Sequence, residues 1–189
     1  MREGDGEIVR QRLSLRETRR RRWDERLYVR FPGIVQALMR VVMRLRPSSW
    51  IRRVLVRRQW ERMLEAANRQ DWDAVFAIIP SDPSDFETIT PPEMVGLGFE
   101  PVYRGREERL RYQLTWIEQL GEFEQGAEEV IDLGDRMLVL ARMRGTGLGS
   151  GAEFASELAY LVTISEGQPI REQAFRSHAE ALEAAGLSG

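Results

Sequence analysis

Apolar residues recur at helical spacing along the first two-thirds of the chain, and the first such segment is FPGIVQALMRVVMRL. Four of its residues form one stripe on a helix: Ile34, Leu38, Val41 and Leu45. This spacing predicts an amphipathic helix with the stripe buried. Pro32 and Gly33 precede the stripe and Pro47 follows it, as expected near the ends of a helix.

The same spacing predicts three further helices, over about residues 50–69, 72–79 and 105–120. A polar turn, NRQD, separates the first two of them. In the last one Tyr112, Trp116 and Leu120 recur every four residues, so they share one face.

The last third of the chain has the pattern of strands. GAEEVIDLGDRMLVLARMRG predicts a hairpin that turns at Gly134 and Asp135, and AEFASELAYLVTISEGQPIREQAFRS predicts a second that turns at Glu166 and Gly167. A shorter strand is predicted over residues 86–90, and HAEALEAAG is predicted to close the chain as a helix. Helices first and an antiparallel sheet last indicate an α+β fold.

A glycine-rich stretch, GTGLGSGA, raises the question of a nucleotide site. From Gly147 it matches the G-x-G-x-x-A pattern of dinucleotide-binding loops, and Glu166 follows about twenty residues later. That pattern needs a helix directly after the glycines, because the helix N-terminus binds the pyrophosphate. Here a predicted strand follows. The glycines are therefore interpreted as a connection between two antiparallel strands.

The composition is that of a globular chain, with 42% hydrophobic and 31% charged residues among 189. The absence of cysteine excludes disulfides and thiol chemistry, and a single histidine, His178, disfavours histidine-based metal sites. We expect no metal and no cofactor. No stretch is apolar enough to span a bilayer and the N-terminus lacks the apolar core of a signal peptide, so we expect a cytoplasmic location.

Charge is divided unevenly along the chain, although the net charge is only −2. Residues 1–62 hold 18 Arg against 7 acids, and the remainder holds 10 Arg against 23 acids. We favour docking of this basic segment on the acidic remainder or on a partner subunit, because its apolar stripe needs burial. Contact of residues 27–46 with an anionic membrane comes second. Nucleic-acid binding comes last, because no recognisable motif accompanies the charge.

Four phrases follow one another after the basic segment: WERMLEAANRQDWDAVFAII, PVYRGREERLRYQLTWIEQLGEF, VIDLGDRMLVLARMRGTGLGSG and EGQPIREQAFRSHAEALEAAGLS. In this order they resemble the SnoaL-like branch of the nuclear transport factor 2-like superfamily, over about residues 53–189. The resemblance implies a curved antiparallel sheet packed against helices as a cone with a pocket. We therefore divide the chain into an arginine-rich helical extension, residues 1–49, and a SnoaL-like domain, residues 50–189.

The resemblance implies function only in outline. Such proteins are commonly dimers through the outer face of the sheet, and they include polyketide cyclases, ketosteroid isomerases, epoxide hydrolases and proteins without known activity. We expect a protein that binds an apolar small molecule in its cone. The alternatives are a cofactor-free cyclase, isomerase or hydrolase that uses a pocket carboxylate, and a membrane-peripheral or scaffold protein that acts through its basic segment.

The candidate catalytic residues are Glu87 and Tyr160. The resemblance places the isomerase base at Thr90, just before a proline, but threonine cannot take up a proton near neutral pH. Glu87 on the same strand could serve as base if it faces the interior, where burial would raise its pKa; otherwise it is a solvated strand residue. A second isomerase position falls on Tyr160, whose hydroxyl could stabilise an oxyanion. No inward carboxylate is evident on the late strands, where the cyclases carry theirs.

The candidate ligand-binding residues are four aromatic residues and one arginine: Trp60, Tyr112, Trp116, Phe175 and Arg142. Aromatic side chains line pockets for flat apolar ligands, and the alternative for each is plain core packing. Arg142 could hold an anion, or could pair with Glu157 or Glu172 across the sheet. His178, at the start of the last helix, is interpreted as a surface residue rather than a pocket base.

Overall fold

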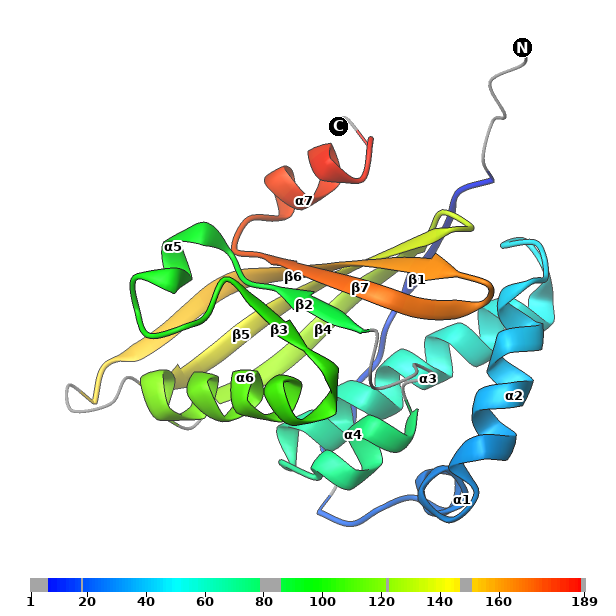
Figure 1. The fold of residues 1–189 in the computed structure, drawn as a ribbon, viewed down its shortest axis with the longest axis horizontal. Helices are drawn as coiled ribbons and strands as arrows, with labels where there is room; N and C mark the ends of the chain where they lie inside the picture. The colour runs from blue at the N-terminus through cyan, green and yellow to red at the C-terminus, as the bar shows by residue number, and fades with distance from the viewer. Residues whose placement is uncertain (1–6, 18, 79–85, 122, 147–150, 188–189) are drawn as a thin grey trace.

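The structure, a computed structural model, describes residues 7–17, 19–78, 86–121, 123–146 and 151–187. The strands within these ranges are β1 (Val9–Arg12), β2 (Glu87–Ile89), β3 (Val102–Arg104), β4 (Phe123–Asp132), β5 (Arg136–Thr146), β6 (Glu153–Ser165) and β7 (Gln168–Phe175). The helices are α1 (Trp23–Arg30), α2 (Pro32–Met43), α3 (Trp50–Asn68), α4 (Trp72–Ile78), α5 (Pro92–Val95), α6 (Gly105–Leu120) and α7 (His178–Ala184) (Figure 1).

The strands form one curved, open sheet in the order β1-β4-β5-β6-β7-β2-β3. The predicted α+β fold is confirmed, but the sheet is mixed rather than purely antiparallel, because β2 runs parallel to β7. The hairpin of β6 and β7 turns where the sequence predicts, with Glu166 and Gly167 both at positive φ. Strands β5 and β6 are antiparallel, with Thr146 opposite Glu153. Gly147 and Gly149 of the glycine-rich stretch lie outside the described residues.

Alternating side chains of the sheet serve two separate cores. On the inner face Val139 and Tyr160 pack against Val56 and Leu64 of α3. On the outer face a second cluster packs around α7, with Leu138, Leu140, Ala159, Phe175 and Ala181 as its buried members. Figure 1 shows α3, α4 and α6 on one side of the sheet and α7 on the other. The inner face is therefore the one that can enclose a site.

The first 49 residues contribute to the same core. Strand β1 pairs with β4 and forms the edge of the sheet, and Met39, Val42 and Met43 of α2 are buried beside residues of α3 and the inner face. In the structure, the extension thus docks on the remainder of the chain. The division at residue 49 remains a sequence-based prediction, because the extension and the sheet share apolar contacts.

The buried face of α2 is not the predicted one. Ile34, Leu38 and Val41 are 69%, 54% and 60% exposed. Helix α2 has two neighbouring apolar stripes, and the end of the sheet packs against the one that carries Met39 and Val42. The prediction that the first stripe is buried is therefore wrong.

Candidate functional site

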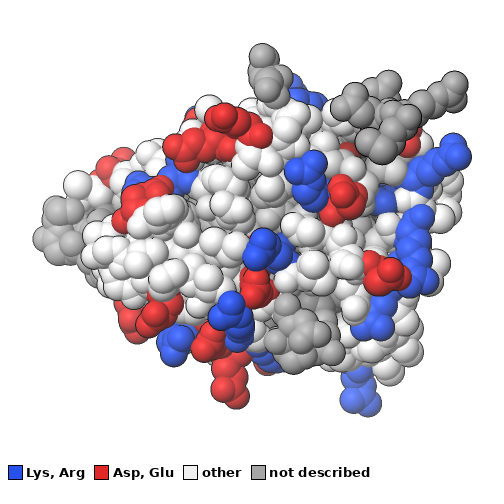
Figure 2. All heavy atoms as spheres, turned by 45° about the horizontal axis from the view of Figure 1, so that its top comes forward, with Lys and Arg blue, Asp and Glu red and all other residues white. Residues whose placement is uncertain are grey.

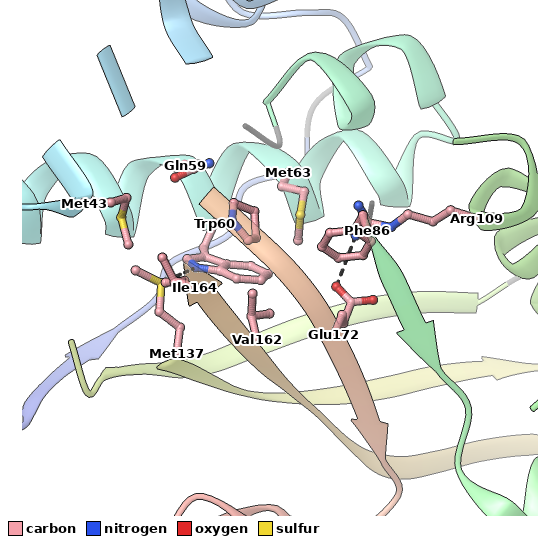
Figure 3. A pocket seen from close by; sticks show the side chains of 11 residues that line it. Met43, Gln59, Trp60, Met63, Phe86, Arg109, Met137, Val162, Ile164 and Glu172 are labelled. Atoms are coloured by element: carbon pink, nitrogen blue, oxygen red, sulfur yellow. Dashed lines mark hydrogen bonds and ion pairs between the residues drawn. The ribbon is translucent and has the colours of Figure 1, made fainter. Parts of the chain in front are cut away.

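A cavity of about 40 Å³ lies between α3 and the inner face of the sheet. Its lining is almost entirely apolar and includes Trp60, Met63, Met137, Val162 and Phe86 (Figure 3). Such a space holds a few water molecules. Three of the lining residues are methionines, Met43, Met63 and Met137, whose flexible side chains can adapt to a guest.

One ion pair lies at the edge of this cavity. Arg109 on α6 donates a hydrogen bond from Nη2 to Oε2 of Glu172 on β7, over 3.1 Å. Both side chains are buried, at 7% and 5% exposure. The Arg109 guanidinium also lies over the ring of Phe86, 4.1 Å from its centroid (Figure 3), a favourable cation–π arrangement. Within the described residues, the hydrogen bond to Glu172 goes to Oε2, and none is made to its other oxygen.

The same ion pair lines a second small cavity, of about 30 Å³, and Met63 also lines both cavities. Here the walls also include polar groups, namely Gln113, Gln125 and Tyr160. The Tyr160 hydroxyl donates to Oε1 of Gln125 over 3.1 Å. Burial raises the pKa of Tyr160 well above its usual value, so its phenol stays protonated and can act only as a neutral donor or acceptor at neutral pH.

A larger hollow of about 290 Å³ lies outside the first cavity. Phe86 and Arg109 line both spaces, so among the described residues this stacked pair lies between the hollow and the first cavity. The extension supplies part of the outer wall through Val29, Pro32 and Gln36. Residues 1–49 therefore help to shape the site as well as the core.

Glu87 faces away from this site. Its carboxylate pairs with Arg104 over 3.0 Å and with Arg171 over 3.2 Å on the outer side of the sheet. Hydrogen bonds from Arg171 and Arg104 hold the pKa of Glu87 below its usual value, the opposite of what a buried base needs. The structure thus gives Glu87 the solvated environment and leaves the catalytic role without support.

The inward carboxylate that the sequence did not reveal is Glu172. In the parallel register Glu87 lies beside Arg171 and Thr88 lies beside Glu172, so neighbouring positions of β2 and β7 alternate between the outer and inner faces. The expectation that the late strands carry no inward carboxylate is therefore wrong. The partner of Glu172 is Arg109 and not Arg142, which pairs with Glu128 over 2.6 Å.

The remaining candidates are dispersed. Trp60 lines the first cavity and donates from Nε1 to Sδ of Met137 over 3.4 Å. Tyr112 and Trp116 pack edge-on against Phe99 in an aromatic cluster, and they are not among the cavity-lining residues. Tyr112 and Trp116 are therefore core residues, the alternative to a ligand-binding role.

Phe175 and Arg142 lie on the outer face and cannot reach the cavities from there. Phe175 packs in the cluster around α7, and Arg142 is half-exposed in its pair with Glu128. His178 is also on this side, where its Nε2 lies 2.7 Å from the carbonyl oxygen of Ala141. Thr90, at the position of the isomerase base, donates its hydroxyl to the carbonyl of Glu100.

Arg109 was missed although the sequence holds a signal for it. It precedes Tyr112 by three residues and Trp116 by seven, so it shares their face of α6. Glu172 had no such signal, because Arg171 and Gln173 on either side of it are polar too. Only the register with β2 and β6 shows which of these residues points inward.

Comparison with solved structures identifies the fold. An NTF2-like protein of unknown function from Burkholderia pseudomallei K96243 matches with a TM-score of 0.56 at 20% identity, over 67% of this chain and 93% of that one. TerC, co-crystallised with polyporic acid, matches with a TM-score of 0.56 at 18% identity, over 67% and 94%. A candidate SnoaL-like polyketide cyclase from Jannaschia sp. CCS1 matches with a TM-score of 0.51 at 21% identity, over 70% and 91%. The chain has the nuclear transport factor 2-like fold.

The likeness extends to the fold alone. No protein-family profile matches the sequence, and no curated protein matches it significantly. Each of the three solved structures is covered almost completely, whereas at most 70% of this chain is matched. This chain therefore has residues beyond the shared nuclear transport factor 2-like fold. Any ligand has to be inferred from its own site.

Proposed function

We propose that this protein binds a small, largely apolar molecule inside its cone and holds a hydrogen-bond donor of that molecule at Glu172. The observation that carries this proposal is the buried pair of Arg109 and Glu172 between two cavities. The free oxygen of Glu172 can accept a hydrogen bond from a hydroxyl or amine group. The apolar walls around Trp60 and Val162 suit the rest of the ligand.

Stability alone is a weak reason for such a pair. Taking two charges out of water costs several kcal/mol per ion, and apolar replacements of similar volume are often as stable or more stable. Arg109 and Glu172 lie beside Met63, Trp60 and Phe86, so apolar replacements of similar volume would have apolar neighbours on this side. A charged pair at this position is therefore better explained by ligand recognition.

The cavities can hold a small molecule if the side chains between the first cavity and the outer hollow move. The inner cavities are small, and the outer hollow is near the lower limit of ligand pockets. We expect a shift of Phe86 off Arg109 to join the hollow to the first cavity, because among the described residues these two are the ones that line both spaces. TerC, a protein of this fold, was co-crystallised with a small organic molecule, polyporic acid.

A second candidate function is acid–base catalysis, with Glu172 in place of Glu87. Glu172 and Tyr160 line the same cavity, so a proton acceptor faces the same space as a hydroxyl, which would have to turn from Gln125 toward a substrate to donate to it. Such a pair can remove a proton from a substrate and stabilise the resulting oxyanion. The variant Glu172→Gln distinguishes binding from catalysis. If Glu172 is a base, this variant should lose turnover but keep some binding.

The experiment is native mass spectrometry of the full chain purified from its own host, followed by identification of any retained small molecule. Wild-type protein is then titrated with that molecule beside Glu172→Gln and Val162→Leu. We expect both variants to bind at least about ten-fold more weakly, since one removes the acceptor charge and the other fills the cavity.

Glu87→Gln is the matched control. It removes a carboxylate on the adjacent strand that is paired with arginine on the opposite face, so binding should stay at the wild-type level. Equal affinity of Glu172→Gln and wild type would contradict the proposal. A retained molecule that binds Val162→Leu as tightly as wild type would place the binding site outside the cone.

A further inference from the structure

The outward side of α2 and of the first turns of α3 carries apolar side chains that nothing in the described chain covers. On α2 these are Ile34, Leu38 and Val41, and at the start of α3 they are Trp50, Ile51 and Val54. We call these six residues the outer apolar face. Trp50 is 72% exposed and Ile34 is 69% exposed. Soluble monomers rarely leave so many large apolar side chains together in water, and such surfaces usually mark an interaction site.

The segment that carries this face is purely basic, although two acids from other segments lie beside it: Glu166 pairs with Arg44 over 3.4 Å, and Glu7 accepts a hydrogen bond from the backbone N–H of Ser48. Residues 27–60 contain eight arginines and not one Asp or Glu. Two of these arginines, Arg52 and Arg58, turn inward to pair with acids. By contrast, the exposed Arg46, Arg53 and Arg57 have no ion-pair partner among the described residues. In Figure 2 arginines gather at the right-hand side, which is the side of α2 in Figure 1.

We propose that the outer apolar face docks on an anionic lipid bilayer. Amphipathic helices bind bilayers in this way, with apolar side chains in the boundary between headgroups and acyl chains and basic side chains on the lipid phosphates. Trp50 is of the residue type that favours this boundary. The mode is peripheral, since in the described part of the chain no helix is both long and apolar enough to cross a membrane.

The chemistry of the surface favours a bilayer over two other occupants. A second copy would bring two surfaces of the same positive charge together, which opposes association through this face. Nucleic acid would satisfy Arg46, Arg53 and Arg57 but offers nothing to the branched aliphatic side chains of Ile34 and Val41. A bilayer with anionic headgroups is complementary to both the apolar and the basic residues.

The proposal is tested by co-sedimentation of the full chain with vesicles of phosphatidylcholine alone and of phosphatidylcholine mixed with phosphatidylglycerol, at low and high salt. We expect binding to the mixed vesicles, weakened by salt. Leu38→Glu with Val41→Glu should abolish it. Arg53→Gln with Arg57→Gln should weaken it about 25-fold, because each arginine near an anionic surface contributes about five-fold in affinity.

Matched controls lie elsewhere on the molecule. Leu114→Glu changes an exposed leucine of α6, and Arg111→Gln with Arg144→Gln removes two exposed arginines; both variants should pellet like wild type. Circular dichroism and thermal unfolding show that each variant is folded. All the changed side chains of α2 and α3 are exposed, so the folded state is expected to persist.

Several outcomes would overturn the proposal. Failure of the wild type to pellet with mixed vesicles is one, and equal pelleting with phosphatidylcholine alone is another. If Leu38→Glu with Val41→Glu instead converts a dimer to a monomer in sedimentation velocity, the occupant is a second copy. If labelled duplex DNA displaces the vesicles and binds the leucine and valine variant as well as wild type, the occupant is nucleic acid.

Discussion

Arg52 and Arg53 are adjacent in the sequence, yet they have opposite environments in the fold. Arg52 is 2% exposed and pairs with Asp132 of β4 through two hydrogen bonds of 2.8 and 2.7 Å. It also donates to the carbonyl groups of Met43 and Leu45 at the end of α2. Arg53 is exposed and has no ion-pair partner among the described residues.

The contrast divides the arginines of the basic segment into two sets. An inward set, including Arg52, Arg58 and Arg62, joins the extension to α3 and the sheet through buried acids. An outward set, Arg46, Arg53 and Arg57, faces solvent around the outer apolar face. The arginines of this segment therefore do not share one role: the inward set stabilises the fold, and the outward set is available for binding.

The largest expected effect comes from the inward set. Arg52→Ala should lower the free energy of unfolding by about 3–5 kcal/mol, because it leaves Asp132 buried without its partner. It also removes the donor that joins the last turn of α2 to the sheet. Urea unfolding monitored by circular dichroism measures this loss.

Arg53→Ala is the matched control, one residue along the same helix, and should change the unfolding free energy by less than about 0.5 kcal/mol. Equal losses in the two variants would remove the distinction between the two sets of arginines.

A second test breaks the contact between α2 and the sheet without touching any charge. Gly167, in the turn between β6 and β7, has φ of +76°, and a Cβ there would come within 2.5 Å of the carbonyl oxygen of Arg40. Gly167→Ala should therefore destabilise the protein by about 2–3 kcal/mol, through left-handed strain and a backbone clash. Gly96→Ala, where a Cβ meets nothing within 4 Å, should cost little. Thermal unfolding of both variants measures the difference. Similar melting temperatures would contradict the close approach of α2 to the turn at Gly167.

Strong local patterns explain which parts of the fold could be predicted. The helix predicted over residues 50–69 is observed as Trp50–Asn68, and the one over 105–120 as Gly105–Leu120. Both long hairpins follow from alternating apolar residues and turn signals. Strand β1 has only four residues at the edge of the sheet, and nothing in its own sequence distinguishes it from an arginine-rich arm.

The side that each residue faces could not be predicted wherever both sides look alike. Helix α2 is apolar on two neighbouring stripes, and its packing on the sheet decides that Met39 rather than Leu38 is buried. Strand β7 is polar on both faces, and its pairing with β2 directs Glu172 inward and Arg171 outward. Such choices depend on contacts between distant segments, which local spacing does not encode.

Acid should weaken the inward set in a predictable way. Burial alone would raise the pKa of Asp24, but hydrogen bonds from Arg62 and Arg58 outweigh it and hold this pKa below its usual value. A lowered pKa in the folded state means that the stabilisation is present above the unfolded-state pKa and is lost as the pH falls through the folded-state pKa. The ion pairs of Asp24 therefore stabilise the protein at neutral pH and disappear at strongly acidic pH.

Asp24→Asn should accordingly cost about 1–2 kcal/mol at neutral pH, because it weakens two charge-assisted hydrogen bonds. The difference from wild type should shrink as the pH falls below about 4. Urea unfolding at a series of pH values measures both curves. A difference that stays constant down to the most acidic pH would show that the charge of Asp24 contributes nothing.

The smallest expected effect on stability belongs to the outward set, and it completes the contrast. Replacing Arg46, Arg53 and Arg57 together by glutamine should change the free energy of unfolding by less than about 0.5 kcal/mol. The stability could even rise slightly, because three like charges around one surface repel each other. Urea unfolding in low salt, where repulsion is screened least, is the sensitive measurement. A loss above about 1 kcal/mol would mean that these arginines hold the fold together as Arg52 does. Unchanged stability combined with lost vesicle binding would instead show that the same residue type, within one short segment, serves two separate purposes.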